Sequence, residues 1–103
     1  MKDLVAKLEV IAVRETGERL ALRAEIGRPQ QEHDGRWACA IAIAPLEGQL
    51  QHVRGADSFH AVWLALALVL KLLANLKADG WRLENEDGSE FPLEAYASGL
   101  DAV

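Results

Sequence analysis

The segment from Gly55 to Gly80 constrains the fold of this chain more than any other, because it is mostly apolar and contains no proline. Asp57 is suited to cap the N-terminus of a helix, since its carboxylate can accept hydrogen bonds from the first free backbone N–H groups. Ser58, one residue later, is the alternative cap. Gly80 suits the position just after a helix, where a left-handed backbone costs glycine nothing. The segment therefore predicts one long helix between these two signals.

Apolar residues occupy well over half of the circumference of this predicted helix. On a helical wheel, its polar residues His60, Lys71 and Asn75 fall on one narrow stripe. The apolar stripe of an ordinary surface helix spans about 100° or somewhat more. One face of a sheet does not cover a much wider arc, so we expect a second contact, most simply with another copy of the chain. Trp63, at one edge of the arc, is the preferred anchor for it, because tryptophan is enriched at the energetic centres of interfaces.

A membrane-spanning helix is the alternative interpretation of so apolar a segment. A span needs about 20 consecutive residues with few or no charges. Here Asp57, His60, Lys71 and Lys77 limit the clean run to the ten residues 61–70. The sequence therefore favours a helix of a soluble domain, and we expect no membrane partner.

Length and composition restrict the class of protein further. The 103 residues suit one domain, spanning 1–103, with a single core. The net charge of −5 argues against a nucleic-acid partner, which requires a basic surface. Cys39 is the only cysteine, so no internal disulfide can form and a reducing compartment fits. The N-terminal residues carry charges and lack the continuous apolar stretch of a secretion signal, so we expect a cytoplasmic protein.

Two alternating segments, 4–14 and 18–26, predict a β-hairpin with one buried face. A two-residue turn at Thr16 and Gly17 would place like charges opposite each other, which is unfavourable. A three-residue loop with Gly17 in the left-handed position places opposite charges across the hairpin instead. The pairs are then Arg14 with Glu18, Glu9 with Arg23, and Lys7 with Glu25. The charges therefore predict the three-residue loop and its register.

The rest of the chain predicts short strands on either side of the helix. A polar loop, 27–35, precedes a strand over 36–44 that is apolar on both faces, with alanines on one of them. Further strands are expected at 50–54, 81–84 and 90–93, before an irregular or helical tail over 93–103. The predicted fold is two-layer α+β: an antiparallel meander of about four strands, one long helix covering it, and a short C-terminal hairpin.

The sequence offers no set of residues with the spacing of a metal or catalytic site. His33, His52 and His60 lie in separate elements without the close spacing of a structural zinc site. Cys39 lies in an apolar strand, which is typical of a small core residue rather than a nucleophile. The serines stand in no nucleophile-elbow pattern. We therefore expect no catalytic residue, metal or cofactor.

Four motifs, in order, span most of the chain. They are I-G-R-P (26–29), W-x-C (37–39), G-x-D-S-F-x-A-x-x-L-A-L (55–66) and D-G-x-x-F-P-L-E (87–94). This order resembles a family of small uncharacterised bacterial domains, although His60 stands where the resemblance leads us to expect glutamine. The resemblance implies a bacterial, cytosolic protein of unknown function and supplies no active-site residue.

The surplus of apolar surface indicates a non-enzymatic interaction domain, most simply a homodimer. The predicted interface combines the outer face of the first strand with the helix: Val5, Ile11, Val13, Trp63, Leu64 and Leu68. A specific version is a bacterial immunity or adaptor protein that blocks a partner with its acidic surface. The alternative is a small-molecule binding protein or minor enzyme with a pocket between helix and sheet, near Trp63 or Trp81.

Overall fold

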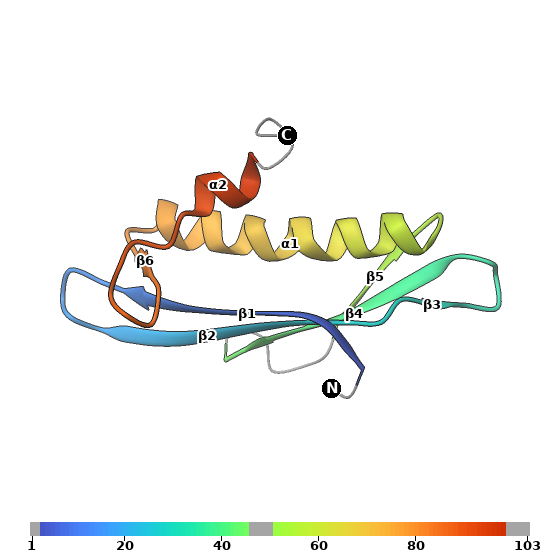
Figure 1. Ribbon diagram of the computed structural model, residues 1–103, viewed down its shortest axis with the longest axis horizontal. Helices are drawn as coiled ribbons and strands as arrows, with labels where there is room; N and C mark the ends of the chain where they lie inside the picture. Colours follow the sequence, from blue (N-terminus) through green and yellow to red (C-terminus); the bar gives the residue numbers. More distant parts are fainter. Residues whose placement is uncertain (1–2, 46–50, 99–103) are drawn as a thin grey trace.

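The computed structural model describes residues 3–45 and 51–98 and shows an antiparallel sheet with one long helix across one face (Figure 1). The elements are β1 (Leu4–Val13), β2 (Arg19–Gly27), β3 (Gln30–Gln31), β4 (Trp37–Ala44), β5 (Gln51–Gly55), α1 (Ser58–Ala78), β6 (Arg82–Glu84) and α2 (Leu93–Ala97). This arrangement confirms the predicted two-layer α+β fold class.

The sheet contains the predicted meander of four strands and two further short strands, β3 and β6. Strands β1, β2, β4 and β5 pair in succession, so β5 lies at one edge. Strand β6 follows the helix in the chain and pairs with β1 at the opposite edge. Helix α1 therefore carries the chain back across one face of the sheet, from the β5 edge to the β1 edge (Figure 1).

The hairpin of β1 and β2 adopts the register that the charges predict. Gly17 has a φ of 91°, and the backbone N–H of Arg14 donates to the carbonyl of Glu18 at 2.9 Å. The residue pairs across the hairpin include Lys7 with Glu25 and Glu9 with Arg23, as predicted. The ammonium of Lys7 nevertheless lies nearest Glu9 of its own strand, at 3.6 Å.

Helix α1 begins and ends at the predicted signals. The carboxylate of Asp57 accepts a hydrogen bond from the backbone N–H of His60 at 2.7 Å. At the other end, Gly80 has a φ of 97°, and the N–H of Trp81 donates back to the carbonyl of Leu76. This pattern, with a second bond from Gly80 to Lys77, is the Schellman motif that glycine allows.

The helix covers the sheet face that carries the larger apolar side chains of β4. Cys39, Ile41 and Ile43 are buried in the core, while the alternate alanines of β4 belong to the outer face. The first half of α1 lies very close to the sheet, since a β-carbon on Gly55 would come within 2.6 Å of the backbone nitrogen of Ala61. Glycine under the helix therefore allows it to rest directly on β5.

Two short elements differ from the sequence-based expectation. Gln30 and Gln31, in the predicted loop, form β3 beside Trp37 and Ala38 of β4. Backbone pairing with β4 and a hydrogen bond from the Gln31 side chain to the carbonyl of Gly35 hold this strand, so it carries no apolar pattern to detect. The predicted return strand 90–93 is reduced to one bridge between Glu84 and Glu90.

Proline explains why the return strand stops so early. Pro92 has no N–H to continue a strand ladder, and the chain turns instead into α2 at Leu93. Part of the predicted strand at 50–54, the turn 45–48 beyond Pro45 and the end of the tail lie outside the described residues.

Candidate interaction surface

The described histidines and acidic residues do not gather into a metal centre. Within 3–45 and 51–98, no three side chains of histidine, cysteine, aspartate or glutamate lie close enough together to hold a metal ion. His60 has a structural role instead: its Nδ1 accepts a hydrogen bond from the backbone N–H of Ala56 at 3.0 Å. It therefore helps to cap α1.

Cys39 is a core residue, as the sequence indicates. Its side chain is fully buried, and the thiol donates a hydrogen bond to the carbonyl of Gly27, with Sγ 3.2 Å from the oxygen. Burial raises the pKa of the Cys39 thiol. A protonated, buried thiol is a poor nucleophile, so this residue does not suggest catalysis.

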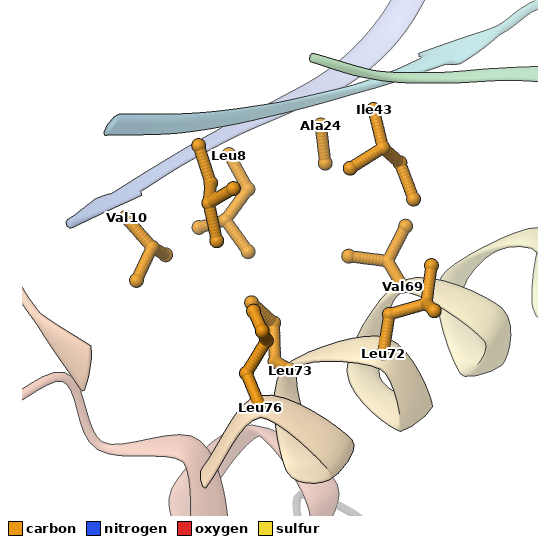
Figure 2. Close-up of a pocket in the computed structure, with 9 residues that line it drawn as sticks. Leu8, Val10, Ala24, Ile43, Val69, Leu72, Leu73 and Leu76 are labelled. Atoms are coloured by element: carbon orange, nitrogen blue, oxygen red, sulfur yellow. The ribbon is translucent and has the colours of Figure 1, made fainter. Parts of the chain in front are cut away.

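A small apolar gap lies in the core between helix and sheet (Figure 2). It has a volume of about 10 Å³ and is lined by apolar side chains of β1, β2, β4 and α1. In that view Leu73 and Leu76 of the helix point toward Leu8 of the sheet, and Leu72 points toward Ile43. A volume of this size holds no more than about one water molecule, so it is not a ligand pocket.

One flank of α1 exposes large apolar side chains. Phe59, Trp63 and Leu66 are 80%, 52% and 43% exposed, and their spacing of four and three residues places them along one side of the helix. Leu70 continues the same side one turn later. This row, Phe59, Trp63, Leu66 and Leu70, is called the open flank below.

The open flank borders an apolar groove on the β1 side of the helix. The groove has a volume of about 330 Å³ and lies between Leu66 and Leu70 of α1, Ala6 and Leu8 of β1, and Tyr96 of α2. Helix α1 packs mainly over β4 and β5, which leaves the upper face of β1 uncovered at this point. The groove is therefore the space between the helix and the uncovered strand.

Helix α2 closes one end of the groove. The ring of Tyr96 stacks on the buried ring of Phe91, with centroids 4.8 Å apart. Lys77 of α1 forms an ion pair with Glu94 at 2.8 Å, and the hydrogen bond from Lys77 lowers the pKa of the Glu94 carboxyl. These two contacts fix Tyr96 beside the open flank.

The six residues predicted to form the interface occupy different environments. Trp63 is 52% and Val5 50% exposed. Ile11 and Leu64 are half-buried, and Leu68 packs against the core. Val13 is only 5% exposed, so it does not contribute the open surface that strand alternation suggests. The strand β6 beside it explains the difference, since Val13 pairs with Arg82.

Sequence reasoning did not single out Phe59, Leu66 and Tyr96. Phe59 and Leu66 lie on the apolar arc of the wheel, and the arc alone does not reveal which of its sides the sheet leaves open. The spacing of Phe59 and Leu66 relative to Trp63 was the available signal. Tyr96 depended on the docking of α2, which has no strong sequence pattern.

Helix α1 has 21 residues and is long and apolar enough to cross a membrane, judged by length and composition alone. Among the described residues, no other helix meets this criterion. The core helix of a soluble protein can meet the same test. Here four of its residues, Ala61, Ala65, Val69 and Leu73, are buried against the sheet.

Comparison with known proteins identifies a family and nothing more specific. The model of a family described as a domain of unknown function, DUF6968, matches residues 9–95. The match confirms the resemblance to an uncharacterised domain family. No curated protein and no solved structure matches the chain.

Proposed function

The chain belongs to the DUF6968 family of unknown function, and from its surface we propose that it is a non-enzymatic interaction domain that associates with a second copy of itself. The observation that supports this most is the open flank, where a phenylalanine and a tryptophan are more than half exposed. Aromatic residues are enriched at protein interfaces, and soluble monomers rarely leave a continuous apolar patch uncovered. Trp63 is the proposed anchor.

The proposal includes the setting in which the domain works. An adaptor or immunity protein of the bacterial cytoplasm fits the single reduced cysteine and the net charge of −5. An acidic surface of this kind disfavours nucleic acid as a partner. In this proposal the apolar flank of α1 meets protein rather than lipid, so α1 remains on its sheet.

Sedimentation velocity over a range of concentrations tests the proposal. We expect the mass of the wild-type chain to rise toward that of a dimer, and Trp63→Ala to raise the dissociation constant about 30-fold, or about 2 kcal/mol. Lys71→Ala is the matched control, because Lys71 is exposed on the polar stripe of the same helix. A chain that remains monomeric at every concentration, or a Trp63→Ala variant that associates like the wild type, would contradict the proposal.

The groove beside the open flank supports a second candidate, a binder of small apolar ligands. Its volume of about 330 Å³ is at the lower end of the range for ligand pockets, about 300–1,000 Å³, and its lining is mostly apolar. This function predicts a strict monomer that binds an apolar fluorescent dye, with binding lost in Leu70→Asp. Dye binding that disappears as the chain dimerises would favour the interaction domain instead.

A further inference from the structure

Strand β1 has an open edge over most of its length. Strand β6 pairs only with residues 11–13 of β1, so residues 4–10 have no neighbouring strand on that side within the part of the chain that the structure describes. Leu4 and Val5 at the start of this edge are 37% and 50% exposed. An open edge presents unpaired N–H and C=O groups that can pair with another strand.

The hydrogen bonds on either side of β1 show which backbone groups face the open edge. The N–H of Arg14 donates to Glu18, so the backbone groups of even-numbered residues back along the strand point toward β2. The other side agrees, because Leu83 of β6 accepts from Phe91 on its far side, which leaves Arg82 and Glu84 to bond β1. The outward groups at the centre of the open edge are therefore those of Lys7 and Glu9.

We infer that two copies of the chain pair through this edge, antiparallel and centred on Leu8, so that two sheets become one. In this register Lys7 of each copy lies opposite Glu9 of the other, and both opposite pairs form at once. Leu8 faces Leu8 of the second copy, and Ala6 faces Val10. The paired stretch is residues 6–10 of each copy, since Ile11 already pairs with Glu84 of β6. The inference rests on the proposed self-association and assigns the strand that carries it.

Charge complementarity selects this register among its neighbours. The helix-facing side chains of the two copies lie on the same face of the joined sheet only when the two-fold axis passes through a residue of β1. The alternative registers are therefore those centred on another residue. A centre on Lys7 or on Glu9 places that residue opposite its own copy, which sets like charges together. A centre on Ala6 pairs Lys7 with Val5 and leaves both lysines without an acidic partner across the edge. Edge lysines normally repel a second strand, but the adjacent glutamate makes this edge complementary to itself.

The same pairing places the two open flanks on one face of the joined sheet. A two-fold axis through Leu8, perpendicular to the sheet, keeps both α1 helices on the same face. The groove beside Leu66 and Tyr96 of each copy then opens toward the seam between the two β1 strands. A second copy therefore accounts for the unpaired strand and lies next to the groove, whereas a ligand in the groove leaves the strand unpaired.

Cysteine cross-linking tests the register. In a centre on Leu8, the two Leu8 residues form a non-hydrogen-bonded pair with Cα atoms about 4.5 Å apart, within reach of a disulfide. The two Ala6 residues are then about 14 Å apart, by the rise of four strand residues. We expect Leu8→Cys to form a covalent dimer under mild oxidation and Ala6→Cys to remain uncross-linked. Cys39 does not compete, because it is fully buried.

Charge reversal tests the pairing without a cross-link. We expect Lys7→Glu and Glu9→Lys each to weaken dimerisation about tenfold or more by sedimentation, and the double variant to restore it. The double variant also restores the Lys7–Glu9 ion pair within each strand. The decisive sample is therefore a mixture of the two single variants, in which each Lys7→Glu copy meets a Glu9→Lys copy with opposite charges across the edge while neither chain regains its own pair. A merely structural role for these residues predicts no restoration in that mixture. Denaturation of each variant monitors the fold.

The outcomes separate this inference from the proposed function. Three outcomes would overturn the β1 pairing and leave self-association standing, provided that the wild type dimerises. They are no cross-link in Leu8→Cys, a cross-link in Ala6→Cys instead, and no rescue by the double variant or by the mixture of the two single variants. The last of these outcomes would also fit association through the open flank alone. A chain that remains monomeric at every concentration would overturn both the β1 pairing and the proposed self-association. This holds even if a strand of a different protein binds the edge of β1.

Discussion

Gly55 is the residue whose side chain, or lack of one, decides how closely helix and sheet approach. A β-carbon there would lie 2.6 Å from the nitrogen of Ala61 and 2.9 Å from the carbonyl carbon of His60. Both are backbone atoms of α1, so no side-chain rotation relieves the contact. The backbone of Gly55 itself is not in the left-handed region, so the requirement for glycine is steric.

We therefore expect Gly55→Ala to destabilise the protein by about 1–3 kcal/mol, the range for overpacking a tight contact. Urea denaturation followed by tryptophan fluorescence measures the change. Ala56→Ser, at the exposed neighbouring position, is the control and should remain within about 0.5 kcal/mol of the wild type. Equal stability of Gly55→Ala and the wild type would show that α1 does not rest on β5 as described.

The sequence identified several single residues correctly because their roles are local. Gly17, Asp57 and Gly80 act on the backbone within a few residues of themselves, so their patterns suffice. Val13 depends on β6, which is far away in the chain. Gly55 contacts Ala61, only six residues on, but the contact arises from the angle at which α1 folds back over β5. Local patterns could not reveal either relation.

At the scale of elements, the start of α1 is held by a reciprocal cap. Asp57 accepts from the N–H of His60, while the His60 ring accepts from the N–H of Ala56. In a capping box, a glutamate or glutamine three residues after the cap accepts from the N–H of the cap residue itself, and here His60 accepts from the residue just before it. His60 takes a similar part, which explains how the chain tolerates histidine where the family resemblance suggests glutamine.

We expect His60→Gln to preserve the stability of the protein within about 0.5 kcal/mol, while His60→Ala costs about 1 kcal/mol by leaving a backbone donor without its partner. Thermal unfolding followed by circular dichroism compares the two variants with the wild type. The expectation fails if glutamine is as damaging as alanine, since the side chain would then have some role other than accepting this bond.

Helices and strands with a clear apolar or charge pattern could be predicted from the sequence, and short elements without one could not. The β1–β2 register followed from opposite charges and one glycine, and the structure reproduces it pair by pair. Strand β3 was missed because its two glutamines carry no apolar alternation. Helix α2 was foreseen only as an irregular or helical tail, since five residues are too few for a periodic pattern.

At the scale of the whole molecule, the charged side chains of the described residues lie at the surface, where some of them form ion pairs. Among the described residues no polar or charged side chain is buried. Hydrogen bonds from Arg54 and from Lys77 lower the pKa of Glu32 and of Glu94, and bonds from Ser89 lower that of Asp87. The first two pairs join segments distant in sequence, at 2.7 and 2.8 Å.

These shifts predict a loss of stability in acid. A carboxyl whose pKa is lower in the folded state contributes stability that is fully present above its ordinary value, 4.5 for glutamate, and is lost as the pH falls through the folded-state value. We expect the urea midpoint to fall as the pH decreases below about 4.5, because the unfolded chain then binds protons at these carboxyls more readily than the folded chain. Glu32→Gln combined with Glu94→Gln should flatten this dependence, and an unchanged slope in that variant would count against the two pairs.

The open surface is the part of the molecule that sequence could outline but not place. The wide apolar arc predicted surplus hydrophobic area and pointed to Trp63, which is half exposed. Its position depends on α1 lying over β4 and β5 rather than over β1, a property of the assembled sheet. No periodicity within the helix encodes that choice.

The late position of β6 in the chain has a consequence for synthesis. Val13 gains its neighbour Arg82 only after the residues between them have left the ribosome, and that takes several seconds at about 5–20 residues per second. Until then the whole outer edge of β1 in the nascent hairpin is accessible to chaperones and to other nascent chains on the same messenger RNA. Three residues of β6 finally cover part of that edge, so the brevity of this last strand governs how much stays accessible in the finished protein.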